Sequence, residues 1–267
     1  PSMAMDAGAL LTCRLHFGAV DQRCTVKIDD VECGSHQGGY LPFYCDLGKL
    51  ELGRHVLEVA VHDDTDRSHH ARGKQSSKPG GIWYTAQSGI WQTVWLEWLA
   101  DEHLASWRID SDLASSAFIF SIVAVGDRQG TIRILDDQVV VSQAEFQGSA
   151  TVRLTVPTLH VWSCEDPHLY GVELRYGSDV VTSYAAAREI SIGTDANGNP
   201  CMVLNGKPCF QAGVLDQGYW PDGLYTAPSD EALAHDIATM KAMGFTMVRK
   251  HIKIEPERWY WHCDRLG

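Results

Sequence analysis

Between about residues 11 and 188, the chain consists of short apolar or alternating runs, each ended by Gly, Asp, Asn or Ser. These runs recur at a spacing of about 8–12 residues with no convincing helix between them, a pattern typical of β-sandwiches. Ten of them have the length and residue types of strands: LTCRLHF, CTVKI, RHVLEVAVH, IWQTVWLEWL, AFIFSIVAV, TIRIL, QVVVSQAEF, ATVRLTV, YGVELRY and DVVTSYAAA. The sequence therefore predicts a mainly β chain.

The pattern changes after Arg188. Asn205-Gly206 lies between apolar flanks and predicts a tight type I′ hairpin, because both central residues of that turn need a positive φ. CFQAGVLDQ follows as a predicted buried strand. The segment PSDEALAHDIATMKAMGF then predicts a helix that Ser229 caps and Gly244 ends.

A second strand, FTMVRKHIKI, and a second helix starting at Pro256 come next. Strand–helix–strand–helix is the beginning of a parallel α/β structure, either a barrel or an open sheet. One and a half such units are too few for a stable parallel fold, so we expect the chain to be a piece of a longer protein.

Composition excludes several classes of partner. A formal net charge of −12 argues against nucleic acid and against an anionic membrane surface, since both require clustered Lys and Arg. No apolar run approaches the roughly 18 residues of a spanning helix. The first residues show no signal peptide, although a processed or truncated start would hide one. Eight scattered cysteines without a C-x-x-C pair favour free thiols and slightly favour the cytoplasm, so localisation stays open.

Four tryptophans lie within GGIWYTAQSGIWQTVWLEWL. Alternation along a strand would place Trp91, Thr93 and Trp95 on one face, so most of this cluster is expected to be core and domain-junction packing. Trp83 and Tyr84 lie in the Gly-rich turn and are the better candidates to face a ligand.

Several segments resemble glycoside hydrolase family 2, the family of β-galactosidases, β-glucuronidases and β-mannosidases. They are LHFGAVDQRCTVKIDDVECGSHQGGYLPFYCDLG, GGIWYTAQSGIWQTVWLE, VWSCEDPHLYGVEL, LNGKPCFQAGVLDQG and MKAMGFTMVRKHIKIEPERWYWHCDRLG. The resemblance implies a jelly-roll sugar-binding domain over 1–99 and an immunoglobulin-like sandwich over 100–187. Residues 188–267 would begin a catalytic TIM barrel, with the chain truncated at both ends.

The same resemblance implies a retaining β-glycosidase, β-galactosidase-like on a neutral sugar, without a cofactor or metal and with a homo-oligomer possible in the full-length enzyme. Such a mechanism uses two carboxylates about 5 Å apart, one as general acid/base and one as nucleophile. In this family both are Glu, one of them preceded by Asn. The chain contains no Asn-Glu pair, so both catalytic glutamates are expected beyond Gly267 and the chain alone is expected to be inactive. The alternative is a non-catalytic carbohydrate-binding module made of two β-sandwiches.

The candidate substrate-binding residues lie at the ends of the two predicted strands. Arg249 matches the family arginine that hydrogen-bonds the nucleophile; a surface ion pair is the alternative. Strand parity would place His251 and Lys253 on the same face as Arg249, with Val248 and Ile252 on the other.

Asp216 and Gln217 end the first strand, in Gly-Val-Leu-Asp-Gln, where familiar β-galactosidases have Gly-Val-Asn-Arg-His. Asp216 would accept bonds from sugar hydroxyls and disfavour a uronic acid, or it caps the loop. Trp83 completes the candidate set. The histidine- and aspartate-rich stretch 62–75 lacks the glycine and distal glutamate of a calcium loop, which favours a solvated loop over a metal site.

Overall fold

The computed structural model describes residues 12–51 and 53–267. They form two compact units. The first contains the described residues up to Leu99 together with 215–233 and 249–259; the second contains 100–214, 234–248 and 260–267. Most of the N-terminal stretch that was inspected for a signal peptide lies in residues 1–11, outside the described part.

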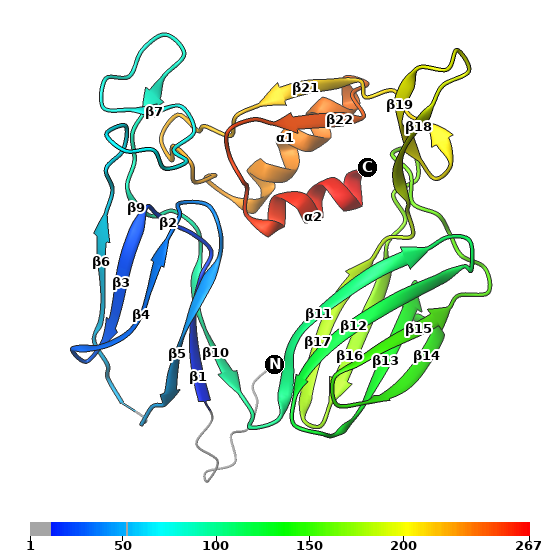
Figure 1. Ribbon diagram of the computed structural model, residues 1–267, viewed down its shortest axis with the longest axis horizontal. Coiled ribbons are helices and arrows are strands. Elements are labelled where there is room, and N and C mark those ends of the chain that lie inside the picture. Colours follow the sequence, from blue (N-terminus) through cyan, green and yellow to red (C-terminus); the bar gives the residue numbers. More distant parts are fainter. Residues whose placement is uncertain (1–11, 52) are drawn as a thin grey trace. The chain divides into compact units, whose positions relative to one another are not determined.

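The first unit is built on two three-stranded antiparallel sheets, in the orders β10-β1-β5 and β4-β3-β6 (Figure 1). Their strands are β1 (Thr12–Phe17), β3 (Arg23–Ile28), β4 (Val31–Gln37), β5 (Phe43–Lys49), β6 (Leu57–His62) and β10 (Val94–Leu99). This unit also contains two short two-stranded sheets: β2 (Val20–Asp21) pairs with β9 (Gly89–Ile90), and β7 (Gln75–Ser76) pairs with β8 (Tyr84–Thr85). Alternate residues of β1 and β3, such as Phe17 and Val26, are buried and form the core.

The second unit contains a three-stranded sheet, β11-β12-β15, and a four-stranded sheet, β14-β13-β16-β17. The strands are β11 (His103–Asp112), β12 (Ala117–Val125), β13 (Gln129–Asp136), β14 (Val139–Gln147), β15 (Ala150–Thr155), β16 (Tyr170–Tyr176) and β17 (Asp179–Ala185). Phe118 and Phe120 from one sheet share a buried core with Ile132, Ile134 and Leu174 from the other. Residues 100–187 contain no helix.

A third, small sheet in this unit joins β18 (Ile190–Thr194), β19 (Pro200–Leu204) and β20 (Lys207–Pro208). Asn205 and Gly206 connect β19 to β20 with φ values of 52° and 76°. The predicted hairpin is therefore confirmed, with both turn residues in the left-handed region.

The two predicted helices are present as α1 (Asp230–Ala242) and α2 (Glu257–Leu266). The Ala232 amide donates to Ser229 Oγ at 3.2 Å, which is the expected N-cap. Gly244 follows α1 with φ 92°, and Pro256 precedes α2 directly. The predicted start and stop signals of α1 are confirmed, and α2 begins one residue after the predicted Pro256.

Strands β21 (Gly213–Asp216) and β22 (Met247–Lys250) form a two-stranded sheet. The Met247 amide donates to Ala212 O, and further along the His251 amide donates to Asp216 O, so the two strands run parallel. The described residues hold no further strand of this sheet, and a TIM barrel is therefore not evident in them. The second strand is also shorter than predicted: β22 ends at Lys250, and Ile252 has a φ of 64°.

The tryptophan prediction is wrong in part. Trp91 is 6% exposed, as expected for core, but Trp95 and Trp98 are 45% and 47% exposed. Trp83, which was expected outside the core, is 43% exposed. The reason is that β10 begins only at Val94, so Trp91 and Trp95 do not alternate along one continuous strand.

Candidate functional site

The candidate site lies in the first unit, at the end of β21 and β22. Asp216 is the last residue of β21 and Lys250 the last of β22. The Lys250 ammonium contacts Asp216 Oδ2 and lies 2.7 Å from Glu255 Oε1. The side chains of Lys250 and Glu255 are 9% and 2% exposed, against 24% for Asp216. Two carboxylates therefore share one largely buried cation.

Lys253 adds a second buried cation. Its side chain is 0% exposed, and its ammonium lies 3.2 Å from Glu255 Oε1. It also donates to the carbonyl oxygens of Gly218, at 2.6 Å, and Tyr225, at 2.8 Å. Burial lowers the pKa of Lys253, while the neighbouring Glu255 carboxylate opposes that shift. An ammonium group has three N–H donors, and these contacts occupy all three.

This arrangement corrects the parity argument for Lys253. The residue was predicted to extend the face of Arg249 and His251, but the strand has ended and the backbone has turned at Ile252. Lys253 instead binds the loop between β21 and α1. Its place as a direct substrate contact stays a prediction, and its visible contacts are those of a residue that holds a loop.

Asp216 has the loop-capping contact that the sequence left open. Its Oδ1 accepts a hydrogen bond from the Gly218 amide at 2.8 Å, two residues on. Gly218 has φ 63°, and a Cβ there would lie 2.2 Å from Glu255 Oε1. Lys250 balances the charge of Asp216, so the expectation that Asp216 would repel an anionic sugar loses its basis. Sequence reasoning considered Asp216 without its partner.

Three polar side chains at this end of the strands have hydrogen-bonding capacity left. Arg249 is exposed, and the described residues supply no hydrogen-bond or ion-pair partner for it. His251 Nδ1 and Gln217 Oε1 are buried atoms without a partner among the described residues. Burial, followed by the charges of Arg249 and Lys74, lowers the pKa of His251, which favours the neutral imidazole. The strand ends thus carry donors and acceptors that a polar ligand could bind.

An aromatic cluster lines the loop between β21 and α1. Tyr219 stacks on Tyr84 with ring centroids 3.8 Å apart, and Tyr225 lies 5.2 Å from the Trp91 ring. The Tyr225 hydroxyl is 2.9 Å from that of Tyr40. Tyr84 was one of the two turn residues expected near a ligand. Trp83, the other, makes no ring contact with this cluster in the described part of the chain, and its role as a substrate residue stays a prediction.

A chain of hydrogen bonds continues from Tyr225 to a buried carboxyl group. The Tyr225 amide donates to Gln87 Oε1 at 3.0 Å, and the Gln87 amide donates to Gln75 Oε1 at 2.7 Å. Gln75 Nε2 in turn donates to Asp21 Oδ2 at 2.9 Å. Burial raises the pKa of Asp21 to about 6, partly opposed by the Gln75 bond and reinforced by Asp63.

Sequence reasoning missed Lys250, Glu255, Tyr219 and Tyr225. Neither Lys250 nor Glu255 was considered as a candidate, although both lie close to candidate residues in the sequence. The sequence did contain a usable signal. Two lysines and a glutamate lie within the six residues 250–255 at the end of a strand, a spacing that favours ion pairs among them.

The described residues contain no group of three or more metal-ligating side chains. In the loop 62–75, Asp63 accepts from the Thr65 amide at 2.7 Å and Asp66 from the Ser77 amide at 3.0 Å, which accounts for both carboxylates. None of the helices in the described part is long and apolar enough to cross a membrane. The arrangement at the strand ends offers hydrogen-bonding groups to a polar ligand, and the carboxylates of Asp216 and Glu255 are both bound by lysines.

Comparison with models of known protein families gave no match. The chain is 28% identical over 190 residues to a β-galactosidase of Lactococcus lactis, an alignment that covers 67% of this chain and 18% of the relative. It is 26% identical over 273 aligned positions to a putative β-glucuronidase of Formosa agariphila, covering 95% of this chain and 32% of the relative.

Among solved structures, the β-glucuronidase of Ruminococcus gnavus superposes with a TM-score of 0.80 at 19% identity. The match covers 97% of this chain and 46% of that one. Another structure of the same enzyme is a complex with D-glucuronic acid. The chain thus spans less than half the length of each of these proteins.

Proposed function

Because the chain is a relative of the family 2 glycoside hydrolases, we propose that it forms part of a retaining β-glycosidase acting on a neutral sugar, in the manner of a β-galactosidase. One observation supports the proposal: Asp216 and Gln217 lie at the end of β21, Arg249 and His251 lie at the end of the adjacent parallel strand β22, and the His251 amide donates to Asp216 O. In α/β folds that edge is where substrates bind.

The roles follow from the contacts. Arg249, exposed and without a partner in the described residues, is suited to bind an ionised carboxylate; in the complete enzyme this would be the nucleophile, whose pKa a nearby guanidinium lowers. Gln217 and His251 have the unpartnered atoms that sugar hydroxyls require. Lys250, Lys253, Asp216 and Glu255 together carry no net charge, which suits a neutral sugar.

Both catalytic glutamates remain assigned outside residues 1–267, so residues 1–267 would bind and position the substrate. We further propose the predicted domain limits, 1–99, 100–187 and 188–267. A β-galactosidase-like enzyme would hydrolyse O-glycosidic bonds through a covalent glycosyl-enzyme.

The experiment compares residues 1–267 with the complete reading frame that contains them, on the 4-nitrophenyl β-glycosides of galactose, mannose and glucuronic acid. We expect the complete protein to cleave the galactoside fastest and the 1–267 chain to cleave none. Cleavage by the 1–267 chain would refute the placement of the glutamates, and preference for the glucuronide would refute the neutral sugar. If the complete protein binds sugars without cleaving any, the non-catalytic alternative is correct.

A further inference from the structure

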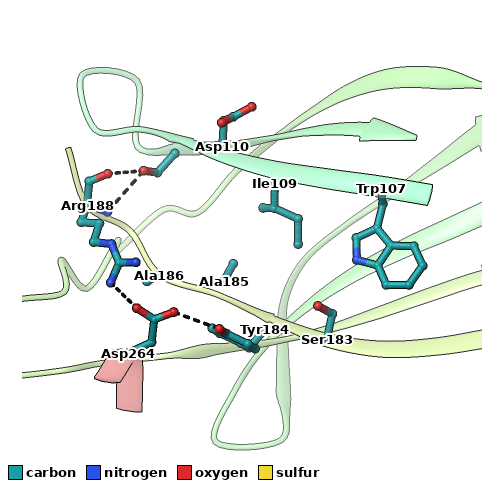
Figure 2. A pocket seen from close by; sticks show the side chains of 10 residues that line it. Trp107, Ile109, Asp110, Ser183, Tyr184, Ala185, Ala186, Arg188 and Asp264 are labelled. Atoms are coloured by element: carbon teal, nitrogen blue, oxygen red, sulfur yellow. Dashed lines mark hydrogen bonds and ion pairs between the residues drawn. The ribbon is translucent and has the colours of Figure 1, made fainter. Parts of the chain in front are cut away.

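The second unit contains a pocket of about 440 Å³, within the size range of small-molecule sites (Figure 2). Its walls are β11 and β17, and Arg188 and Asp264 close one end. This pocket contains none of the candidate substrate-binding residues, and nothing in the proposed hydrolysis requires it.

A fixed ion pair forms the polar end. Arg188 Nη1 lies 2.7 Å from Asp264 Oδ1, and the Tyr184 hydroxyl donates to Asp264 Oδ2 at 2.9 Å. The Arg188 amide is held by Ser111 Oγ at 3.3 Å. Both charged side chains are still partly exposed, 28% for Arg188 and 19% for Asp264. The pair thus presents N–H donors next to carboxylate lone pairs, and a hydroxyl group both donates and accepts.

The other end is aromatic. Figure 2 shows Trp107 across the pocket from Arg188 and Asp264, with Ile109, Ala185 and Ser183 between them. Trp107 is 36% exposed, and its side chain has no hydrogen-bond or ring partner among the described residues. Its indole N–H and the Ser183 hydroxyl therefore have capacity for a ligand. The small Ala185 and Ala186 side chains leave the space open.

The charges around the pocket cancel. Arg188 neutralises Asp264, and Asp110, the other lining acid, is bound by Arg108 at 2.8 Å. A neutral ligand with hydroxyl groups at one end and a C–H face at the other matches these walls, because aromatic rings pack against apolar faces while the ion pair serves the hydroxyls. We propose that this pocket binds a neutral saccharide of one or two sugar units, as a carbohydrate site on the second unit.

The test uses the 1–267 chain with 5-fluorotryptophan, observed by fluorine NMR. The Trp107 resonance is identified by its loss in Trp107→Phe. Methyl β-glycosides of galactose, glucose and mannose are titrated separately, with methyl β-D-glucuronide as the charged comparison. We expect at least one neutral glycoside to move the Trp107 resonance with a Kd on the order of 1 mM, as befits a small open site.

Ser183→Phe fills the pocket and should weaken that response at least about tenfold. Thr182→Phe adds the same ring at the preceding, exposed residue of β17, and should leave the Kd within about twofold of that of the unchanged chain. If Ser183→Phe does not fold, Ala186→Leu fills the same space. The proposal is overturned if no neutral glycoside moves the Trp107 resonance, if the filled pocket responds like the unchanged chain, or if only the glucuronide binds.

Discussion

The ammonium of Lys253 lies 3.2 Å from Glu255 Oε1, and both side chains are almost fully buried, 0% and 2% exposed. Glu255 also receives Lys250 at 2.7 Å. One buried carboxylate therefore contacts two lysines, and removing one partner of such a buried group leaves the remaining charges without compensation.

From this relationship we predict that Glu255→Gln lowers the free energy of unfolding by about 3–5 kcal/mol. The substitution keeps the shape of the side chain and removes the charge that Lys250 and Lys253 share. Urea denaturation followed by tryptophan fluorescence measures the loss. The matched control is Glu58→Gln. The exposed Glu58 carboxylate lies 3.5 Å from the Lys27 ammonium, so this substitution should lower the free energy of unfolding by no more than about 1 kcal/mol. Equal losses in the two variants would show that the buried network contributes little.

Gly218 yields a second prediction. Gly218→Ala should destabilise the chain by about 1–3 kcal/mol more than Gly206→Ala. Both glycines have positive φ, 63° and 76°, so the backbone strain is similar. A new Cβ at 218 meets Glu255 Oε1 at 2.2 Å and Lys253 Nζ at 2.9 Å, whereas nothing lies within 4 Å at 206. The midpoints of urea denaturation give the comparison, and indistinguishable midpoints would contradict the close packing of the cluster.

The pH dependence of stability should contain a contribution from Asp21. Its pKa is about 6 in the folded chain, chiefly because of burial, against 3.8 for the ordinary side chain. The folded state therefore holds the proton more tightly, so this contribution is full below about pH 4 and is lost as the pH rises through 6. Asp21→Asn cannot ionise and still offers Gln75 an acceptor oxygen.

We expect Asp21→Asn and the unchanged chain to differ least near pH 4, and Asp21→Asn to gain up to about 3 kcal/mol relative to it by pH 7.5. Thermal unfolding at a series of pH values measures the difference. Asp112→Asn is a useful comparison. The hydrogen bond from Arg153 is the main reason why the pKa of Asp112 is lowered to about 2, so Asp112→Asn should lose stability relative to the unchanged chain as the pH rises, the opposite of Asp21→Asn. Parallel pH profiles for Asp21→Asn and the unchanged chain would refute the raised pKa.

The features that the sequence predicted well depend on local physics. The Asn205-Gly206 hairpin needs two residues that tolerate positive φ, and the start of α1 needs a cap such as Ser229; both can be recognised within a few residues. Asp216 and Arg249 were candidates because polar residues at strand ends stand out against apolar strands, and their role in substrate binding stays a prediction.

What could not be predicted depends on backbone direction and on contacts distant in sequence. Parity holds only inside a strand, and the positive φ of Ile252 separates Lys253 from the face of Arg249. The contact of Tyr225 with Tyr40 joins residues 185 positions apart, which no local pattern encodes. The tryptophan cluster was misassigned for the first of these reasons, since the strand expected to carry Trp91 starts three residues later, at Val94.

Arg249 and Lys250 are adjacent cations for which we predict opposite consequences. Arg249 is exposed and has no partner in the described residues, so Arg249→Gln should change the free energy of unfolding by no more than about 0.5 kcal/mol. Lys250 is 9% exposed, contacts two carboxylates and lies 4.6 Å from the Trp259 ring. Lys250→Met keeps much of the side-chain volume but leaves Asp216 without a cation and Glu255 with only Lys253, and should cost about 3 kcal/mol or more.

Urea denaturation of the two variants separates these roles, and hydrolysis by the complete protein adds a second readout. With the fold intact, Arg249→Gln should still lower kcat by at least about tenfold, because a guanidinium that stabilises an ionised nucleophile acts on the chemistry and not on folding. A large loss of stability in Arg249→Gln, or none in Lys250→Met, would mean that the two residues have the reverse roles. Full kcat in Arg249→Gln would remove that residue from the active site.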